Sequence, residues 1–564
     1  MDRHAPPGQP SDSAAAARKR LDRPDKIALI GLAIVMAAGL YLTTRRALKL
    51  SIPFADTHTY LAPGRNLLEG RGFVTRFNVV HGWVGDAAHP GLGYYNPLYG
   101  LTLAVAWHVL RDASYLSIAT TVFPCLLNAV LIFLLVRPTL GRLVGVMSAA
   151  GYLTFPSTYV NIGLIGAEHP LVTICLIVLL MVQRLVPRSP RYWALVGVVL
   201  GIGGLVKVTI LAVAPALVAG LAFTKIGPIA ERIRRSIGPA LLLVAGIAVI
   251  LVPFNLMCLT TTGKAYPEYP SLAKNWSMSV LYGGEFVEGS PAVRPDPAGL
   301  PSVWGYLGII GRNLGTMSMA VLNEIWVLML LIVVALWVSG PARTKETAYL
   351  FCVGGAFLAA YAVAFYWLPL GDEPTSPRRY ALHTAAFWYP LGVAGLVHLV
   401  NRLRFGEVGR GVAAVALWGA ASLPAWVMLG QYQHLAHTRS ESRSTGLKRT
   451  MDGCRKLTGP DDLIAVGGGS LEMCGTMFLE RPVVVLPSGE MDNLADVRRF
   501  MEIFKPVLVV PASCHAIFSI APKMGYELVR IPSYKPNGEP LAAFKRGRSS
   551  SQAGSQVATD QRSP

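Results

Sequence analysis

Residues Pro53–Gly72 read PFADTHTYLAPGRNLLEGRG, and they follow directly on the first long apolar segment of the chain. The stretch carries an acid, Asp56, next to that segment, and it ends in a glycine-rich exit at Gly70 and Gly72. A carboxylate placed between a bilayer and water is costly unless it is paired or does chemical work. We therefore interpret the rest of the chain as a membrane scaffold that holds Asp56 opposite other charged side chains.

The composition is that of a polytopic membrane protein. Of the 564 residues, 52% are hydrophobic and only 15% are charged, whereas soluble domains carry about a quarter of charged residues. The apolar residues fall in long blocks, as membrane-spanning helices require. The net charge is +19, but much of it lies in short loops between these blocks, where basic residues orient helices and contact anionic lipid. Nucleic acid is therefore not an expected partner.

The apolar blocks predict an α-helical membrane domain over residues 27–430, with about eleven transmembrane helices. We expect a disordered cytoplasmic tail over residues 1–26 and an uncleaved signal anchor after it, because no A-x-A cleavage site follows the first block. The expected spans cover residues 27–42, 115–136, 143–160, 170–185, 193–207, 209–224, 238–256, 316–338, 347–369, 382–401 and 411–430.

The arginine-rich loops between these spans predict the orientation in a bacterial plasma membrane. They place the N-terminus in the cytoplasm, and they place the loops 44–114 and 257–315 and the C-terminus on the outer face. Within the first of these loops, Pro97–Leu110 is apolar but has only 14 residues, against roughly 20 for a span. We expect it to form a helix that lies in the membrane interface.

The C-terminal part of the chain has a different pattern, which predicts a small α/β domain over residues 440–545 on the outer face. Short β-rich runs (LIAVG, PVVVLP, PVLVVP and ELVRI) alternate there with helical stretches near 443–457, 493–503 and 515–523. Gly467–Gly469 follow the first run, but the G-x-G-x-x-G spacing fails, because residue 472 is Glu. A turn is therefore preferred to a dinucleotide site. Residues 546–564 form a polar, disordered tail.

Charged residues of both signs map to the outer ends of the expected spans or to the outer loops. They are Asp56, Glu168, Lys207, Lys264, Glu324, Arg378 and Arg379. A proton-coupled transporter would instead place acids at the membrane midplane, in broken helices with repeat symmetry. The arrangement favours a site that faces the outer leaflet and takes an amphiphilic ligand.

Several of these segments resemble the motifs of one family in order and in membrane side. DTHTYLAPGRNLLEGRGF (56–73) is similar to the first-loop acid motif of the GT-C glycosyltransferases, in particular the bacterial protein-mannosyltransferase and aminoarabinose lipid A transferase group. The resemblance continues in NPLYGLTLA (96–104), LIGAEHPLVTICLIVLL (164–180), GGLVKVTILAVAP (203–215), SPRRYALHTAAFWYP (376–390) and RPVVVLP (481–487). It covers most of residues 27–545. The chain departs from the aminoarabinose members at Asn96, where they have a lysine.

The resemblance implies transfer of a sugar from a polyprenyl-phosphate donor to a hydroxyl on a lipid-linked glycan, a lipid A-like core or a protein. A carboxylate suits the removal of the hydroxyl proton, and cations suit the leaving phosphate. We expect Asp56 to be the general base and Glu168 to orient the acceptor or, if a divalent cation such as Mg²⁺ or Mn²⁺ is used, to hold it together with Asp56. The expected phosphate ligands are Arg378, Arg379, Lys207 and Lys264, and the expected sugar or acceptor contacts are Tyr60, His169 and Tyr380.

Structural roles stay open beside these functional ones. Asp56 and Glu168 could each cap a helix, His169 could be hydrogen-bonded within the scaffold, and Lys207 could snorkel to the interface. Lys264 could be solvated in its loop, and Tyr380 could belong to the aromatic belt. Two other functions also remain: a lipid or polysaccharide transporter or flippase without transferase chemistry, and a non-catalytic assembly protein that presents the 440–545 domain.

Overall fold

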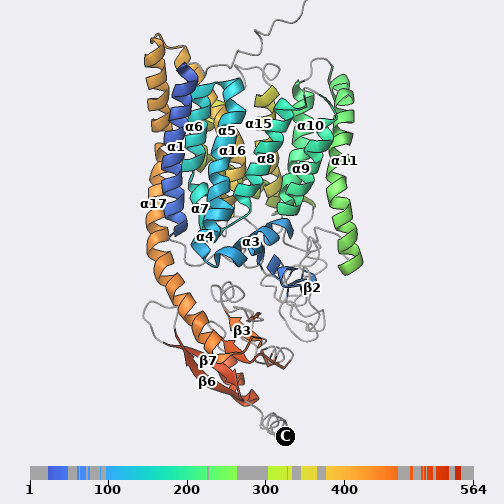
Figure 1. Cartoon of the computed structure of the whole chain (residues 1–564), viewed down its shortest axis with the longest axis vertical. Coiled ribbons are helices and arrows are strands. Elements are labelled where there is room, and N and C mark those ends of the chain that lie inside the picture. The colour runs from blue at the N-terminus through green and yellow to red at the C-terminus, as the bar shows by residue number, and fades with distance from the viewer. Residues whose placement is uncertain are drawn as a thin grey trace, which may run out of the picture.

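The structure is a computed structural model that describes a large part of the chain. The described residues are 23–48, 60–61, 64–65, 67–70, 74–75, 89–90, 97–186, 189–224, 228–262, 303–326, 328–332, 345–364, 376–460, 462–467, 483–486, 494, 497–498, 501–502, 505–511, 516–532 and 540–547. Helices dominate up to residue 457, and a small sheet follows (Figure 1). The helices of the first part are α1 (Arg23–Leu48), α3 (Pro97–Leu110), α4 (Ala113–Ser117), α5 (Phe123–Leu140), α6 (Arg142–Thr154), α7 (Pro156–Leu164), α8 (Glu168–Arg184), α9 (Tyr192–Val206), α10 (Val213–Thr224), α11 (Ile229–Thr262), α13 (Val303–Ile325), α15 (Lys345–Ala364), α16 (Ser376–Asn401) and α17 (Glu407–Leu457).

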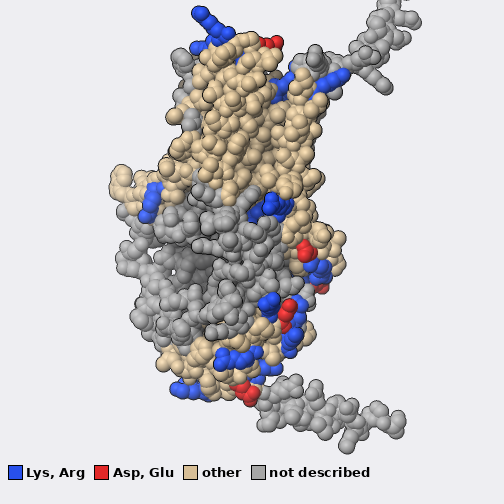
Figure 2. All heavy atoms as spheres, turned by 90° about the vertical axis from the view of Figure 1, so that its left-hand side faces the viewer, with Lys and Arg blue, Asp and Glu red and all other residues tan. Residues whose placement is uncertain are grey.

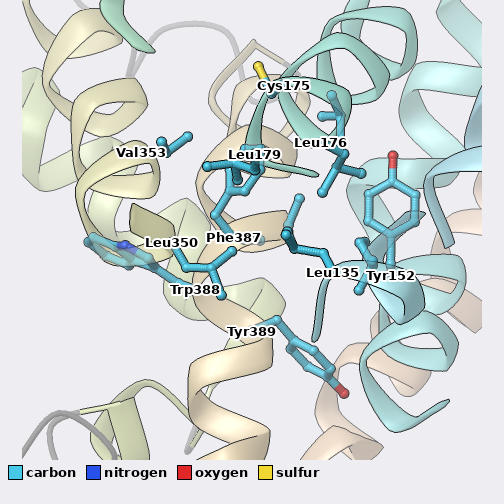
Figure 3. Packing of buried hydrophobic residues seen from close by; sticks show 14 of the residues in the cluster. Leu135, Tyr152, Cys175, Leu176, Leu179, Leu350, Val353, Phe387, Trp388 and Tyr389 are labelled. Carbon is cyan, nitrogen blue, oxygen red and sulfur yellow. The ribbon is translucent and has the colours of Figure 1, made fainter. Parts of the chain in front are cut away.

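One hydrophobic core joins these helices into a bundle. Figure 3 shows side chains of α5, α8, α15 and α16 meeting in it, among them Leu135, Leu179, Val353 and Phe387. Each of these residues is at most 3% exposed. Helices in a bilayer associate through van der Waals packing of such side chains, so this core fixes how α8 and α16 lie relative to each other.

Four described helices are long and apolar enough to cross a membrane alone: Lys26–Leu48, Ala113–Leu140, Ile229–Met257 and Glu407–Val427. A fifth span results if the bent pair α7 and α8 is counted as one. Shorter apolar helices that include Tyr192–Val206, Val208–Phe223 and Thr347–Val363 lie beside them. Figure 2 shows a broad zone of the helical part whose described side chains carry no charge, as contact with lipid requires.

The structure corrects several expected boundaries. The expected span 143–160 is two helices, α6 and α7, because the chain is extended at Phe155 before Pro156 (φ −60°, ψ 134°), a conformation that a following proline favours. The expected outer loop 257–315 is shorter, since α11 continues to Thr262 and α13 begins at Val303.

The apolar stretch Pro97–Leu110 forms a helix, α3, with the predicted bounds. Figure 1 shows it lying across the end of the bundle on the side of the C-terminal sheet. Its buried residues, Tyr99, Gly100, Leu103, Ala104 and Trp107, recur at helical spacing on one face. Val105 and Val109 on the other face are 47% and 73% exposed. The helix therefore packs one side on the protein and leaves the other exposed, and its position in the membrane interface stays a prediction.

Two breaks in the helices face this same end of the bundle. Between α7 and α8 the chain bends by 119°, and Ile165 adopts a left-handed conformation (φ 49°, ψ 49°) at the corner. Between α9 and the 3₁₀-helix η3 (Val208–Ala212), Lys207 is extended (φ −163°, ψ 119°). Ile165, Ala167 and Val206 belong to one buried cluster with Tyr60 and Tyr99. The two corners are therefore packed side by side.

The C-terminal part contains a five-stranded sheet in the order β4-β3-β5-β7-β6. β3 (Ile464–Gly467), β4 (Val483–Leu486), β5 (Leu508–Val510) and β6 (Tyr526–Ile531) coincide with the four β-rich runs. β7 (Leu541–Arg546) was not expected, and it pairs antiparallel with β5 and β6. The expected helix near 443–457 is the end of the 51-residue helix α17, which runs from the bundle into this domain (Figure 1). The structure further contains a two-stranded ribbon of β1 (Val74–Thr75) and β2 (His89–Pro90) and a short helix, α20 (Ala516–Ile520).

Candidate functional site

The centre of the candidate site is a buried ion cluster on Glu168. Its side chain is 0% exposed, and its Oε1 accepts hydrogen bonds from Lys207 Nζ at 2.7 Å and from Arg379 Nε at 2.5 Å. The three residues come from the α7–α8 corner, the α9–η3 corner and the first turn of α16, which are distant in sequence. A buried carboxylate with two cations has a net charge of +1. Removing such a group from water has a large free-energy cost, which favours a functional role for the cluster.

The helix breaks explain how Glu168 and Lys207 reach each other. Glu168 begins α8, and its side chain turns to the cations instead of capping the helix, whose N-cap residue Ala167 makes no side-chain cap bond. Lys207 stands between α9 and η3 in extended conformation, so its side chain leaves the helix axis toward Glu168. The alternatives of a helix cap for Glu168 and of snorkelling for Lys207 therefore do not match these contacts.

Aromatic side chains pack against the two cations, Lys207 and Arg379. The Tyr380 ring lies 5.0 Å from Lys207 Nζ and 5.3 Å from Arg379 Cζ, both over the ring face, so it adds a cation–π contact to each. Tyr361 stacks on Tyr380 with ring centroids 4.5 Å apart. Tyr361 also contacts His383 through its hydroxyl, 3.2 Å from Nδ1. Nε2 of the fully buried His383 has no hydrogen-bond partner among the described residues.

Main-chain contacts hold the corner that carries Glu168. The Tyr99 hydroxyl donates to the Ile165 carbonyl at 2.9 Å, and Asn161 Nδ2 donates to the Arg379 carbonyl at 3.1 Å. At the other end of α7, the Glu324 carboxylate accepts from the Ser157 N–H at 3.1 Å, where a helix N-terminus favours negative charge. The corner is therefore tied to α3, to α16 and to α13.

Gly166 leaves the space that the Glu168 carboxylate occupies. A Cβ at residue 166 would overlap Glu168 Oε2 and would lie 3.6 Å from Arg379 Nη2. Oε2 is buried and has no hydrogen-bond partner among the described residues. One carboxylate oxygen thus holds both cations, while the other keeps its acceptor capacity.

His169 belongs to a separate buried network. Its Nδ1 lies 2.8 Å from the Tyr152 hydroxyl and its Nε2 lies 3.3 Å from the Thr158 carbonyl. Asn128 donates to both the Tyr152 hydroxyl and the His169 carbonyl. Both ring nitrogens therefore have partners inside the scaffold, which favours the structural alternative, and a role of His169 in acceptor binding stays a prediction.

Of the remaining predicted site residues, only Tyr60 has a side chain within the described part of the chain. Asp56 and Lys264 lie outside the described residues, so their roles stay predictions. Arg378 lies in the first turn of α16, but its side chain is outside the described part. Tyr60 is 4% exposed and packs edge-on against Tyr99, with ring centroids 5.1 Å apart. It lies beside the corner that carries Glu168, in one buried cluster with Ile165 and Ala167.

Sequence reasoning missed Tyr361, His383 and Asn161. His383 follows Arg379 by four residues, a spacing that places both on one face of a helix, and this was the available signal. Tyr361 and Asn161 stand alone in apolar helices and gave none. Among the described residues no group of three or more His, Cys, Asp or Glu side chains could hold a metal ion. The use of Mg²⁺ or Mn²⁺ by Asp56 and Glu168 stays a prediction, because Asp56 is not described.

Comparisons with known proteins bear on this arrangement. The sequence profile of the family "Dolichyl-phosphate-mannose-protein mannosyltransferase" matches residues 97–256, the segment with α3, both corners, Glu168 and Lys207. No curated protein matches the chain significantly. Among solved structures, ArnT from Cupriavidus metallidurans bound to undecaprenyl phosphate matches with a TM-score of 0.55 at 13% identity, over 92% of this chain and 98% of that one. The chain has the GT-C fold.

Two further structures support the GT-C fold. The apo form of the same ArnT matches with a TM-score of 0.53 at 12% identity, over 92% of this chain and 98% of that chain. The oligosaccharyltransferase of Archaeoglobus fulgidus, in complex with Zn and sulfate, matches with a TM-score of 0.51 at 14% identity, over 89% of this chain and 72% of that one. The expected resemblance to GT-C proteins, with a helical membrane domain and a small C-terminal sheet, is thus confirmed for the fold.

Proposed function

We propose that the chain is an inverting membrane glycosyltransferase that moves a sugar from a polyprenyl-phosphate donor to an acceptor hydroxyl at the outer face of the membrane. The observation that carries the proposal is the cluster of Lys207 and Arg379 on Glu168 in a GT-C fold. The family that matches residues 97–256 is named for a lipid-phosphate sugar donor. One of the similar structures holds undecaprenyl phosphate.

The two cations suit the leaving group of such a donor. As the bond between the anomeric carbon and the phosphate oxygen breaks, the electron pair stays on the phosphate, whose negative charge grows. Lysine meets this charge as a point cation, and arginine meets it through several N–H donors. Because the site is buried, the stabilisation is larger than it would be in water. No proton donor is needed, because a phosphate is a weak base.

The acceptor hydroxyl needs a base on the opposite side of the sugar, and Asp56 is the proposed one. Tyr60 and Leu61, just after it in the chain, pack in one cluster with Ala167 and Val206, the residues that precede Glu168 and Lys207. Tyr60 follows Asp56 by four positions, and an extended chain spans at most about 3.6 Å per residue. Chain connectivity alone therefore keeps the Asp56 Cα within about 14 Å of the Tyr60 Cα. A single displacement, in which the hydroxyl attacks the face opposite to the leaving phosphate, inverts the anomeric centre.

The proposal extends to the orientation of the chain and to its partners. We place the N-terminus in the cytoplasm and the C-terminal domain on the outer face of a bacterial plasma membrane. Figure 1 is consistent with this, since α1 begins at the end of the bundle opposite to the C-terminal sheet. The acceptor is a lipid-linked glycan, a lipid A-like core or a protein hydroxyl.

A transfer assay with an Asp56→Asn variant tests the proposal. Purified protein is incubated with radiolabelled polyprenyl-phosphate sugars and a membrane extract that supplies acceptors, and transfer of the label is measured. We expect the wild type to transfer sugar and Asp56→Asn to lose at least a hundredfold in rate, as loss of a general base does. The matched control is Asp112→Asn, since Asp112 caps α4 through the Ser114 and Tyr115 N–H groups and Asn caps equally well. Full transfer by Asp56→Asn would remove Asp56 as the base, and movement of lipid without transfer would favour the transporter.

A further inference from the structure

In the ion cluster, the two cations that a phosphate ligand would need are already bonded to Glu168. Both cations that the described residues bring together already point at a single oxygen, Glu168 Oε1. A phosphate that needs Lys207 and Arg379 must compete with that carboxylate for the same N–H groups. Two anions on the same pair of cations would repel each other at short range, where the interaction is strongest.

The three side chains of the cluster differ in how far solvent reaches them. Glu168 is 0% exposed, whereas the side chains of Lys207 and Arg379 keep 10% and 7%. Tyr380, whose ring faces both cations, is half-buried. Solvent therefore reaches part of each cation, whereas the carboxylate is fully enclosed.

We propose that Glu168 is a resident counter-ion that the donor's phosphate displaces from Lys207 and Arg379. Without the donor, the carboxylate keeps two buried cations ordered and neutralises one of them, which avoids the cost of leaving both uncompensated. When the phosphate binds, the cations turn to it and Oε1 loses its two partners. Because Oε2 has no partner among the described residues in the first place, the displaced carboxylate then offers both oxygens to hydroxyl groups.

This exchange orders the events at the site. Glu168 becomes a strong hydrogen-bond acceptor for the incoming hydroxyl only after the donor has bound, because before that its Oε1 is held by two charged donors. The inference deepens the proposed function and rests on it, because it takes Lys207 and Arg379 as the phosphate ligands. Glu168 occupies these two cations until the donor's phosphate binds.

Binding of farnesyl phosphate to the purified protein in detergent, measured by titration calorimetry, tests the exchange. A competing anion weakens phosphate binding, so Glu168→Gln is expected to bind farnesyl phosphate at least tenfold more tightly than the wild type and to transfer sugar more slowly. Lys207→Gln is expected to bind at least tenfold more weakly. The double variant restores the net charge of +1 and is expected to return to within about threefold of the wild type, because the two changes act on phosphate binding in opposite directions.

Two controls separate this effect from general ones. Farnesol, which lacks the phosphate, is expected to bind all variants equally. Glu231→Gln removes a carboxylate from the exposed ion pair with Arg235 on α11 and is expected to leave the affinity for farnesyl phosphate unchanged.

The outcomes distinguish the inference from the function beneath it. If the wild type binds farnesyl phosphate no better than farnesol, the phosphate site itself is wrong. If it does bind, but Glu168→Gln binds with equal or lower affinity, only the exchange is overturned, and Glu168 is a fixed part of the phosphate pocket. Should Glu168→Gln fail to fold, the double variant decides the question, because the exchange requires it to bind at least threefold more tightly than Lys207→Gln.

Discussion

Replacement of Arg379 by methionine should destabilise the protein through the loss of one buried charge. The Arg379 side chain is 7% exposed, and its Nε lies 2.5 Å from Glu168 Oε1. Removal of one partner from a buried ion pair costs about 3–5 kcal/mol. Lys207 still compensates Glu168 in the variant, so the lower end, about 3 kcal/mol, is expected. Methionine keeps much of the side chain's length, and the bond from Asn161 survives because it is made to the main-chain carbonyl of residue 379.

Equilibrium unfolding in mixed detergent–SDS micelles, followed by tryptophan fluorescence, gives the free energy of unfolding. The matched control is Arg235→Met, which breaks the ion pair of Arg235 with Glu231 on α11, where the side chains are 52% and 35% exposed. Exposed pairs contribute about 0–1 kcal/mol. An equal loss of stability in the two variants would refute the assignment of Arg379 to a buried cluster.

Three further predictions concern Gly166, Tyr99 and Cys454. Gly166→Ala should lower sugar transfer at least tenfold in the radiolabel assay, because its Cβ would overlap the Glu168 carboxylate, whereas Gly411→Ala, where a Cβ meets nothing within 4 Å, should keep full transfer. Tyr99→Phe should lower the free energy of unfolding by about 1–2 kcal/mol, since it leaves the Ile165 carbonyl without its donor; an unchanged value would show that the bond does not hold the corner. Burial raises the pKa of Cys454 to about 12, so iodoacetamide at pH 8 should modify this thiol only after unfolding, as mass spectrometry of the peptide would show.

The sequence allowed the membrane class and the short helix at Pro97–Leu110 to be predicted, because both follow from the length of apolar runs. Pro97–Leu110 is too short to span, and the structure has it as α3 with the same bounds. The breaks at Phe155 and Lys207 were not foreseen, because the apolar runs continue through them. Hydropathy reports how apolar a segment is and not whether the helix axis changes direction. β7 was missed because LAAFKR has little β-branched or aromatic character, and its pairing with β5 and β6 is a tertiary effect.

Three of the predicted site residues, Glu168, Lys207 and Arg379, meet in the structure, but their contacts were not predicted. Topology placed Glu168, Lys207 and Arg379 at one end of the bundle, because each lies at the end of an apolar block. That a single carboxylate oxygen takes both cations depends on the packing of α8, α9 and α16, which no local pattern encodes. For the same reason His383 and Tyr361, which lie inside apolar helices, were not recognised beside the cations.

Native mass spectrometry of the purified protein, with the bound lipid identified by fragmentation, tests the central claim most directly. The account predicts that the wild type retains a polyprenyl phosphate and that the double variant Lys207→Gln with Arg379→Gln loses it while it keeps ordinary phospholipids. A double variant that retains the polyprenyl phosphate as fully as the wild type would contradict the assignment of this cluster to the donor's phosphate.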